Sequence, residues 1–242
     1  MFGEIRNPKG ERIDYTFHAG APSATRLLVI GHGVTGNKDR PFILALASNL
    51  ADVGIPTLRF SYSGNGSSEG RFAESTISKE VADLGSVLDS VKGYEIGYAG
   101  HSMGGAVGVL RASQDLRIRF LISLAGMVHT RAFAQREFGA VKPDHGFMWD
   151  DTECPLSQSY MDDASLIDSV APKAKSITVP WLLIHGTEDD VVPIQDSKDI
   201  LAQAGPNASF QSLPGTNHVF SGESNTAAMI TVVREWLKAR GW

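Results

Sequence analysis

The sequence is poor in the features that mark secreted, membrane-bound or nucleic-acid-binding proteins. Cys154 is the single cysteine among 242 residues, so no internal disulfide can form. No apolar run approaches the roughly 20 residues of a membrane-spanning helix, and the first ten residues lack the apolar centre of a signal peptide. Lysine and arginine are not clustered, and the formal net charge is −5. We therefore expect a cytoplasmic protein that binds neither nucleic acid nor a membrane.

What the chain does contain is ordinary for a globular protein, with 42% hydrophobic and 20% charged residues. Its length fits one large domain, with at most a modest insertion. Residues 5–17 resemble a hairpin that turns at residues 7–10. Apolar strands are then expected at 27–30, 55–60, 94–99, 119–124, 181–184 and 208–213. Helices are expected at 41–53, 77–91, 105–111, 193–204 and 226–240. Strands that alternate with helices predict an α/β fold with a mostly parallel sheet covered on both faces.

One interval interrupts this alternation. Between Gly126 and Val179 about fifty residues show no clear strand, which is too long for a structureless loop in a compact domain. Residues 130–138 and 160–170 are candidate helices. We therefore expect a small helical cap at residues 127–176, inserted into a core made of residues 1–126 and 177–242.

The most informative stretch is the G-x-S-x-G pentapeptide from Gly100 to Gly104, which has Ser102 at its centre. An expected strand precedes it and an expected helix follows it. A sharp turn from strand to helix lifts a serine hydroxyl above the edge of the sheet, where it can act as a nucleophile. A serine that merely caps the helix is the plainer alternative.

A second G-x-S-x-G match, from Gly66 to Gly70, has Ser68 at its centre. The preceding strand ends several residues earlier, and the surrounding stretch is polar and rich in glycine, which is typical of a loop. We therefore predict that Ser102, and not Ser68, is the nucleophile.

A serine nucleophile needs a base and an acid that orients the base. After a nucleophile elbow these partners follow in the order acid, then histidine. His218, in an expected loop between the last strand and the last helix, is the predicted base. A histidine on the surface of that loop is the alternative.

The acid is expected after the strand at 181–184, where Glu188, Asp189 and Asp190 follow one another. We predict Asp189, with Asp190 as the main rival. The other two acids must be solvated or cap a helix, because three adjacent carboxylates cannot all be buried, and Asp190 could cap the helix near Pro193. A metal site at His185, Asp189, Asp190 and His218 is a further interpretation, but no ligand spacing supports it. No metal and no organic cofactor is expected.

The oxyanion that forms when serine attacks requires two backbone donors. We predict the N–H of Met103, directly after the nucleophile, and the N–H of Val34, in the glycine-rich loop after the first apolar strand. His32 precedes the acid in the chain and is expected to be a structural hydrogen-bonding residue.

Taken together these segments resemble the α/β-hydrolase superfamily. The resemblance spans nearly the whole chain, and the G-x-x-D-x-x-V-P pattern from Gly186 to Pro193 implies that Asp189 is the acid. It likewise implies that His218 is the base and that Val34 and Met103 form the oxyanion hole.

The stretch from His32 to Lys38 is similar to the H-G-x-T-G-N-K stretch of bacterial cinnamoyl and feruloyl esterases. Those enzymes carry a short cap after the sixth strand of the fold, which matches the interval at 127–176. The chain departs from them at Val34, where they often carry an aromatic residue.

These features predict a serine carboxylesterase that acts on a small-molecule ester with a short, medium or aromatic acyl group. A thioesterase or a peptidase-like amidase would use the same three residues. A non-catalytic ligand binder on the same fold is the alternative from another class. The sequence does not decide whether the protein forms a homodimer.

Overall fold

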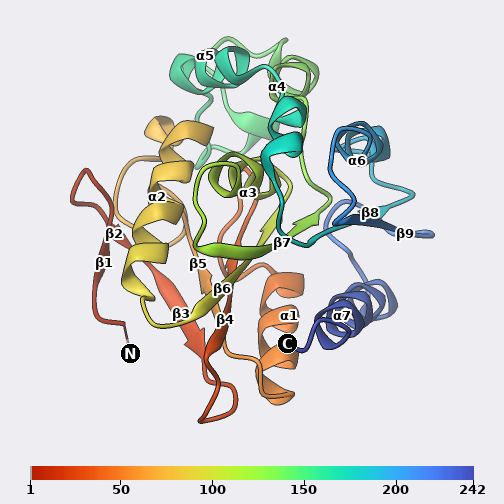
Figure 1. Ribbon diagram of the computed structural model, residues 1–242. Helices are drawn as coiled ribbons and strands as arrows, with labels where there is room; N and C mark the ends of the chain where they lie inside the picture. Colours follow the sequence, from red (N-terminus) through yellow and green to blue (C-terminus); the bar gives the residue numbers. More distant parts are fainter. Residues whose placement is uncertain (1) are drawn as a thin grey trace.

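The computed structural model describes residues 2–242 and contains a seven-stranded sheet in the order β3-β5-β4-β6-β7-β8-β9 (Figure 1). Neighbouring strands are parallel, except that β3 runs antiparallel to β5. The strands are β3 (Tyr15–His18), β4 (Arg26–Gly31), β5 (Thr57–Phe60), β6 (Glu95–His101), β7 (Ile118–Leu124), β8 (Trp181–Gly186) and β9 (Ala208–Leu213). The mostly parallel sheet predicted from the sequence is confirmed.

The N-terminal hairpin was predicted only in part. Strands β1 (Ile5–Arg6) and β2 (Arg12–Ile13) do pair around the expected turn. The prediction was wrong for residues 15–17, because β3 leaves the hairpin and forms the edge of the large sheet by pairing with β5, with Tyr15 opposite Phe60. This pairing satisfies backbone groups that β5 would otherwise leave open at the sheet edge.

Helices cover both faces of the sheet (Figure 1). The helices α2 (Ile77–Ser90), α3 (Met103–Ala112) and α6 (Ile194–Leu201) contribute to one apolar cluster. The helices α1 (Pro41–Asp52) and α7 (Glu223–Lys238) contribute to the other. Side chains alternate along a strand, so Leu27 and Val29 of β4 enter the first cluster while Leu28 and Ile30 enter the second.

The chain between β7 and β8 is helical, as predicted. It contains α4 (Thr130–Phe138), η2 (Met148–Asp150), α5 (Gln158–Ile167) and η3 (Ala171–Ser176). Helix α5 begins and ends earlier than expected, because the Ser157 hydroxyl caps it by accepting from Tyr160 N (3.2 Å) and Asp168 ends it at φ 63°. Helices α4 and α5 lie together at one end of the molecule (Figure 1). The division of the chain into a core and a cap at 127–176 stays a prediction.

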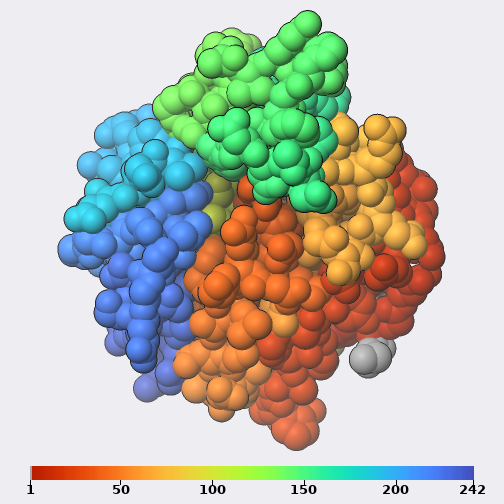
Figure 2. Space-filling model, turned by 180° about the vertical axis from the view of Figure 1, so that it is seen from behind, coloured from red at the N-terminus to blue at the C-terminus, as the bar shows by residue number. Residues whose placement is uncertain are grey.

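The space-filling view shows where the chain near residue 100 reaches the surface. Its yellow-green atoms lie at the bottom of a recess between the orange surface of the first fifty residues, the green surface near residue 150 and the blue surface of the C-terminal part (Figure 2). Within residues 2–242, no helix has the length and apolar character needed to cross a bilayer.

Candidate active site

Four loops meet at the carboxyl edge of the parallel sheet, where ligands of open α/β sheets bind. They follow β4, β6, β8 and β9, and they carry Val34, Ser102, Asp189 and His218 respectively. A cavity of about 300 Å³ opens between them. It is lined by Gly33, Val34, Thr35, Gly36, Arg40, Phe42, His101, Ser102, Trp149, Val191, His218 and Val219. The structure thus brings the predicted nucleophile and the predicted base to one cavity.

Ser102 lies at a sharp turn between β6 and α3 and is buried. Its backbone has φ 53° and ψ −119°, a region that a non-glycine residue enters only under strain. The turn is held because Ser102 N donates to Leu124 O (2.9 Å) and Ser102 O accepts from Gly105 N (2.8 Å). The strand–turn–helix geometry expected of a nucleophile elbow is therefore present.

Two side chains that are distant in the sequence, His218 and Asp189, form a buried pair. His218 Nδ1 lies 2.8 Å from Asp189 Oδ2. A carboxylate only accepts hydrogen bonds, so Nδ1 carries the proton and Nε2 of a neutral ring keeps a free lone pair. An imidazole oriented in this way can accept a proton from a serine hydroxyl.

The Asp189 carboxylate is fully buried and has four donors around it. Its Oδ1 accepts from the N–H groups of Val191 (3.0 Å) and Val192 (2.8 Å), and its Oδ2 lies 3.1 Å from His185 Nε2 as well as accepting from His218. Burial alone would raise the pKa of Asp189, but the hydrogen bonds from His185, His218 and Val192 outweigh it and hold the pKa well below its usual range. Asp189 therefore stays ionised beside the imidazole.

The two neighbouring acids have no comparable setting. Glu188 and Asp190 are exposed. The expectation that Asp190 caps the next helix was wrong, because α6 starts after Pro193 with no side-chain cap. Proline at that position fixes the backbone for helix entry without a side-chain donor or acceptor.

The loop predicted to supply an oxyanion donor is held in place by His32. This ring donates from Nδ1 to Gly33 O (2.8 Å) and accepts from Tyr62 N at Nε2 (3.0 Å). Burial lowers the pKa of His32 to about 4, so the ring is neutral at pH 7. The structural role predicted for His32 is confirmed.

The two predicted oxyanion donors flank the nucleophile. Val34 lines the cavity, in a turn where Gly36 N donates to Gly33 O (3.0 Å). Met103 is the first residue of α3, so its N–H has no acceptor within the helix. Gly33 allows the loop to approach Ser102, because a Cβ at Gly33 would lie 2.7 Å from Ser102 Cβ.

Sequence reasoning missed the second ring that positions the base. His101 Nε2 donates to the backbone carbonyl of His218 (2.9 Å), and the two rings lie 4.6 Å apart. Burial holds the pKa of His101 well below its usual value, so it acts as a neutral donor. The only signal was its place inside the pentapeptide, where x admits any residue.

Sequence reasoning also missed His185, although the residue was noted as part of a metal interpretation. Ser197 Oγ lies 2.8 Å from His185 Nδ1, and His185 Nε2 lies 2.9 Å from Val192 O and 3.1 Å from Asp189 Oδ2. The ring thus braces the loop that carries Asp189. Among residues 2–242 no group of three or more histidine, cysteine, aspartate or glutamate side chains is arranged to hold a metal ion.

An aromatic side chain from η2 forms one wall of the cavity. Trp149 is 43% exposed and has φ 49°, an unfavourable conformation for a bulky residue. It is held by its Nε1, which donates to Glu137 Oε2 (3.1 Å), and by an edge-on contact with Phe138 at 4.9 Å between ring centroids. No sequence pattern indicated which aromatic residue of this segment would reach the cavity.

Two other candidate nucleophiles, Ser68 and Cys154, are in settings that do not favour attack on a substrate. Ser68 Oγ donates to Ser61 O (2.7 Å) and accepts from Asp14 N (2.8 Å), so it is a loop residue, as predicted. Burial raises the pKa of the Cys154 thiol to about 12, which removes the reactive thiolate at neutral pH.

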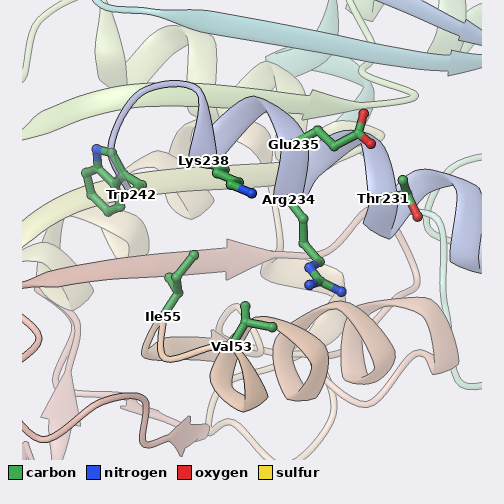
Figure 3. Close-up of a pocket in the computed structure, with 7 residues that line it drawn as sticks. All are labelled: Val53, Ile55, Thr231, Arg234, Glu235, Lys238 and Trp242. Carbon is green, nitrogen blue, oxygen red and sulfur yellow. The ribbon is translucent and has the colours of Figure 1, made fainter.

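A larger cavity lies away from these residues. It measures about 400 Å³ and is lined by residues of α7, by Val53 directly after α1, and by Ile55 and Trp242 (Figure 3). None of the predicted site residues is among those that line it.

The fold and the converging loops define an α/β-hydrolase. Residues 79–240 match the prolyl oligopeptidase family, and the chain belongs to that family. Among solved structures, Est1E from Butyrivibrio proteoclasticus with ferulic acid bound superimposes with a TM-score of 0.88 at 27% identity, covering 98% of each chain. Mouse alpha/beta hydrolase domain-containing protein 10 superimposes with a TM-score of 0.81 at 20% identity, covering 98% of each chain.

A relative in sequence has no described activity. The uncharacterized protein Rv2307c of Mycobacterium tuberculosis is 28% identical over 227 residues, which are 92% of this chain and 73% of the relative. The protein is a hydrolase by family and fold.

Proposed function

We propose that the protein is a serine carboxylesterase in which Ser102, His218 and Asp189 form the catalytic triad. The carrying observation is that Ser102, at a strained turn, shares one cavity with His218, whose Nδ1 is bound to the buried Asp189 carboxylate. The likeness to Est1E, solved with ferulic acid bound, supports an ester substrate.

In the proposed reaction His218 Nε2 takes the proton of Ser102 as Oγ attacks the ester carbonyl carbon. The N–H groups of Val34 and Met103 hold the oxyanion. His218 then passes the proton to the departing alcohol, and an acyl group remains on Ser102. Water, deprotonated by the same imidazole, releases the acid and restores the serine.

The lining of the cavity favours a neutral or anionic ester over a peptide. It includes the apolar side chains of Val34, Phe42, Trp149 and Val191 and the cation Arg40, but no carboxylate. A peptide bound near its amino terminus would bring a positive charge that this cavity does not neutralise. The apolar wall at Trp149 suits an aliphatic or aromatic acyl group.

The family match keeps an amidase as the second candidate, because the family takes its name from an oligopeptidase. A matched ester, thioester and amide of one acyl group separate the three activities when each kcat/KM is divided by the rate of uncatalysed hydrolysis, because esters are intrinsically more reactive than amides. We expect this ratio to be highest for the ester. A higher ratio for the amide than for the ester would replace the esterase proposal by the amidase.

Labelling with a fluorophosphonate probe tests the nucleophile. We expect one adduct, on Ser102, and we expect Ser102→Ala to lose both the label and the hydrolysis of p-nitrophenyl butyrate. Ser68→Ala is the matched control, since it removes a hydroxyl from the other G-x-S-x-G stretch, and it should keep most of the activity. An unlabelled, inert wild-type protein would instead favour the non-catalytic binder.

A further inference from the structure

A second cavity adjoins the catalytic one on the side of the loop that carries His218. It measures about 360 Å³ and is lined by Arg40, Pro41, Phe42, Val219, Phe220, Ser221, Gly222 and Thr226. Arg40, Phe42 and Val219 also line the catalytic cavity, so the two cavities share a wall. The two cavities therefore lie side by side, and the exposed side chains of Arg40 and Val219 lie where they meet.

The position of this second cavity relates it to the departing alcohol. Val219 to Gly222 directly follow His218, the group that would protonate the leaving oxygen. The leaving group must lie on the imidazole's side when it receives that proton. Trp149 and Val191 line the catalytic cavity but not the second one. The acyl part of the ester would therefore lie against these two side chains.

Arg40 supplies the only formal charge among the residues that line the second cavity. Its Nη2 donates to Thr35 O (3.1 Å), which leaves further guanidinium N–H groups for other acceptors. The neighbouring Asp39 is bound by Lys38 (2.8 Å) and by Arg59. Within residues 2–242 no carboxylate forms an ion pair with Arg40.

We propose that the second cavity binds the alcohol part of the ester and that Arg40 selects alcohols carrying a carboxylate or phosphate group. This inference rests on the esterase function proposed above. A guanidinium forms short, charge-assisted hydrogen bonds with either anion. The bond from Ser102 Oγ to the carbonyl carbon forms, the bond from that carbon to the alcohol oxygen breaks, and His218 protonates that oxygen. The anionic alcohol then leaves from Arg40.

Three butyrate esters with closely matched alcohols test the proposal. The alcohols are 3-hydroxybenzamide, which is neutral, 3-hydroxybenzoate and 3-hydroxyphenyl phosphate. Exposed ion pairs contribute little, so we expect kcat/KM to be about threefold to fivefold higher for the anionic esters at low ionic strength. The preference should shrink at about 0.5 M salt, where charges are screened over a few ångströms.

Variants assign the preference to Arg40. Arg40→Gln should bring the ratio of anionic to neutral ester close to one, and Arg40→Lys should keep part of the preference because it keeps the charge. Arg71→Gln is the matched control: this exposed arginine pairs with Glu74 (3.6 Å) and lines neither cavity. All three esters give the same acyl-enzyme, so their deacylation rates must be equal. Rapid-mixing measurements should therefore show the preference for anionic esters in the acylation rate alone.

Three results would overturn parts of this account in distinguishable ways. Equal kcat/KM for the three esters, or an unchanged ratio in Arg40→Gln, would refute the subsite while Ser102-dependent hydrolysis of the benzamide ester still supports the esterase. Phenyl hydrogen succinate carries its carboxylate in the acyl part instead of the alcohol part. If Arg40→Gln lowered kcat/KM more for this ester than for the 3-hydroxybenzoate ester, Arg40 would belong to the acyl site and the alcohol subsite would be refuted. Failure to hydrolyse any ester, with Ser102 unlabelled, would refute the esterase itself.

Discussion

Asp189 differs from the acids beside it in how many donors reach it. Its carboxylate is buried and accepts from two backbone N–H groups and from His218, with His185 Nε2 3.1 Å away. Glu188 and Asp190 are exposed. A buried carboxylate is tolerated only when it is hydrogen-bonded in this way, so this network, rather than the residue type, sets Asp189 apart.

This difference predicts unequal effects of two matching substitutions. Asp189→Asn replaces an acceptor oxygen by an amide that cannot stabilise the imidazolium, and should lower kcat for p-nitrophenyl butyrate by on the order of 10³- to 10⁴-fold. Asp190→Asn should change kcat less than about threefold, since its side chain is solvated. Similar losses in both variants would show that the acid is assigned to the wrong residue.

At this scale the predicted site residues came from motifs and chain order, and side chains that are brought together only by folding were missed. Ser102, Asp189 and His218 follow from motif and chain order, and the structure places Ser102 and His218 at one cavity. The role of His101 was missed because a histidine that bonds a backbone carbonyl across 117 residues leaves no local pattern. His185 was missed although its partners Asp189, Val192 and Ser197 are near in sequence, because only the folded loop turns them toward its ring. Arg40 was missed for the same reason, since only folding brings it beside Val219.

At the scale of elements, helix α2 carries an unusual buried acid. Glu80 is about 1% exposed, and its Oε2 has no hydrogen-bond partner among residues 2–242. The Tyr160 hydroxyl, from α5, is also buried and also has no hydrogen-bond partner among the described residues. Burial, together with the nearby charge of Asp83, raises the pKa of Glu80 well above its usual value. The contact between α2 and α5 therefore contains an acid that is harder to ionise in the folded protein than in the unfolded chain.

This shift predicts how Glu80 affects stability. Between the ordinary pKa of a glutamate and the raised value, the folded state binds more protons than the unfolded state, so the free energy of unfolding falls as pH rises. Glu80→Gln cannot ionise and should flatten that decline, with a gain of about 1–2 kcal/mol at neutral pH. Urea unfolding of both proteins from pH 5 to pH 8 measures it. If the free energy of unfolding changed with pH in the same way in both proteins, Glu80 would not be a buried acid that stays protonated.

The elements themselves were largely predictable, and the exceptions have local causes. Apolar periodicity gave α2 to within one residue, because one face of the helix packs against the sheet. The sequence did not show that β3 would leave the N-terminal hairpin, since strand pairing is decided by the partner available in space and not by the strand's own residues. Nor did it give η2, whose Trp149 is held by contacts with α4.

At the scale of the whole molecule, two ionised aspartates stabilise opposite edges of the sheet. Asp189 lies at the carboxyl edge. Asp115 lies just before β7, where it binds Arg111 (2.6 Å) and Arg117 (2.7 Å), and Arg117 also reaches Asp89 on α2 (2.6 Å). The hydrogen bonds from Arg117 outweigh the effect of burial and hold the pKa of Asp115 below its usual range. One edge thus has a catalytic candidate and the other a purely structural cluster.

These positions predict that resistance to acid and catalysis can be separated. A carboxylate with a lowered pKa in the folded state stabilises the protein above its unfolded pKa, near 4, and loses that contribution as pH falls toward the lower folded value. Asp115→Asn and Asp189→Asn should therefore both reduce the free energy of unfolding at pH 7, and both should show a shallower fall in it below about pH 4. Only Asp189→Asn should abolish ester hydrolysis at neutral pH, because Asp189 binds His218 whereas Asp115 binds Arg111 and Arg117. Chemical unfolding from pH 2.5 to pH 7, with hydrolysis assayed on the same samples, measures both quantities. Loss of hydrolysis in folded Asp115→Asn would mean that the amino edge of the sheet also sets the geometry of the site.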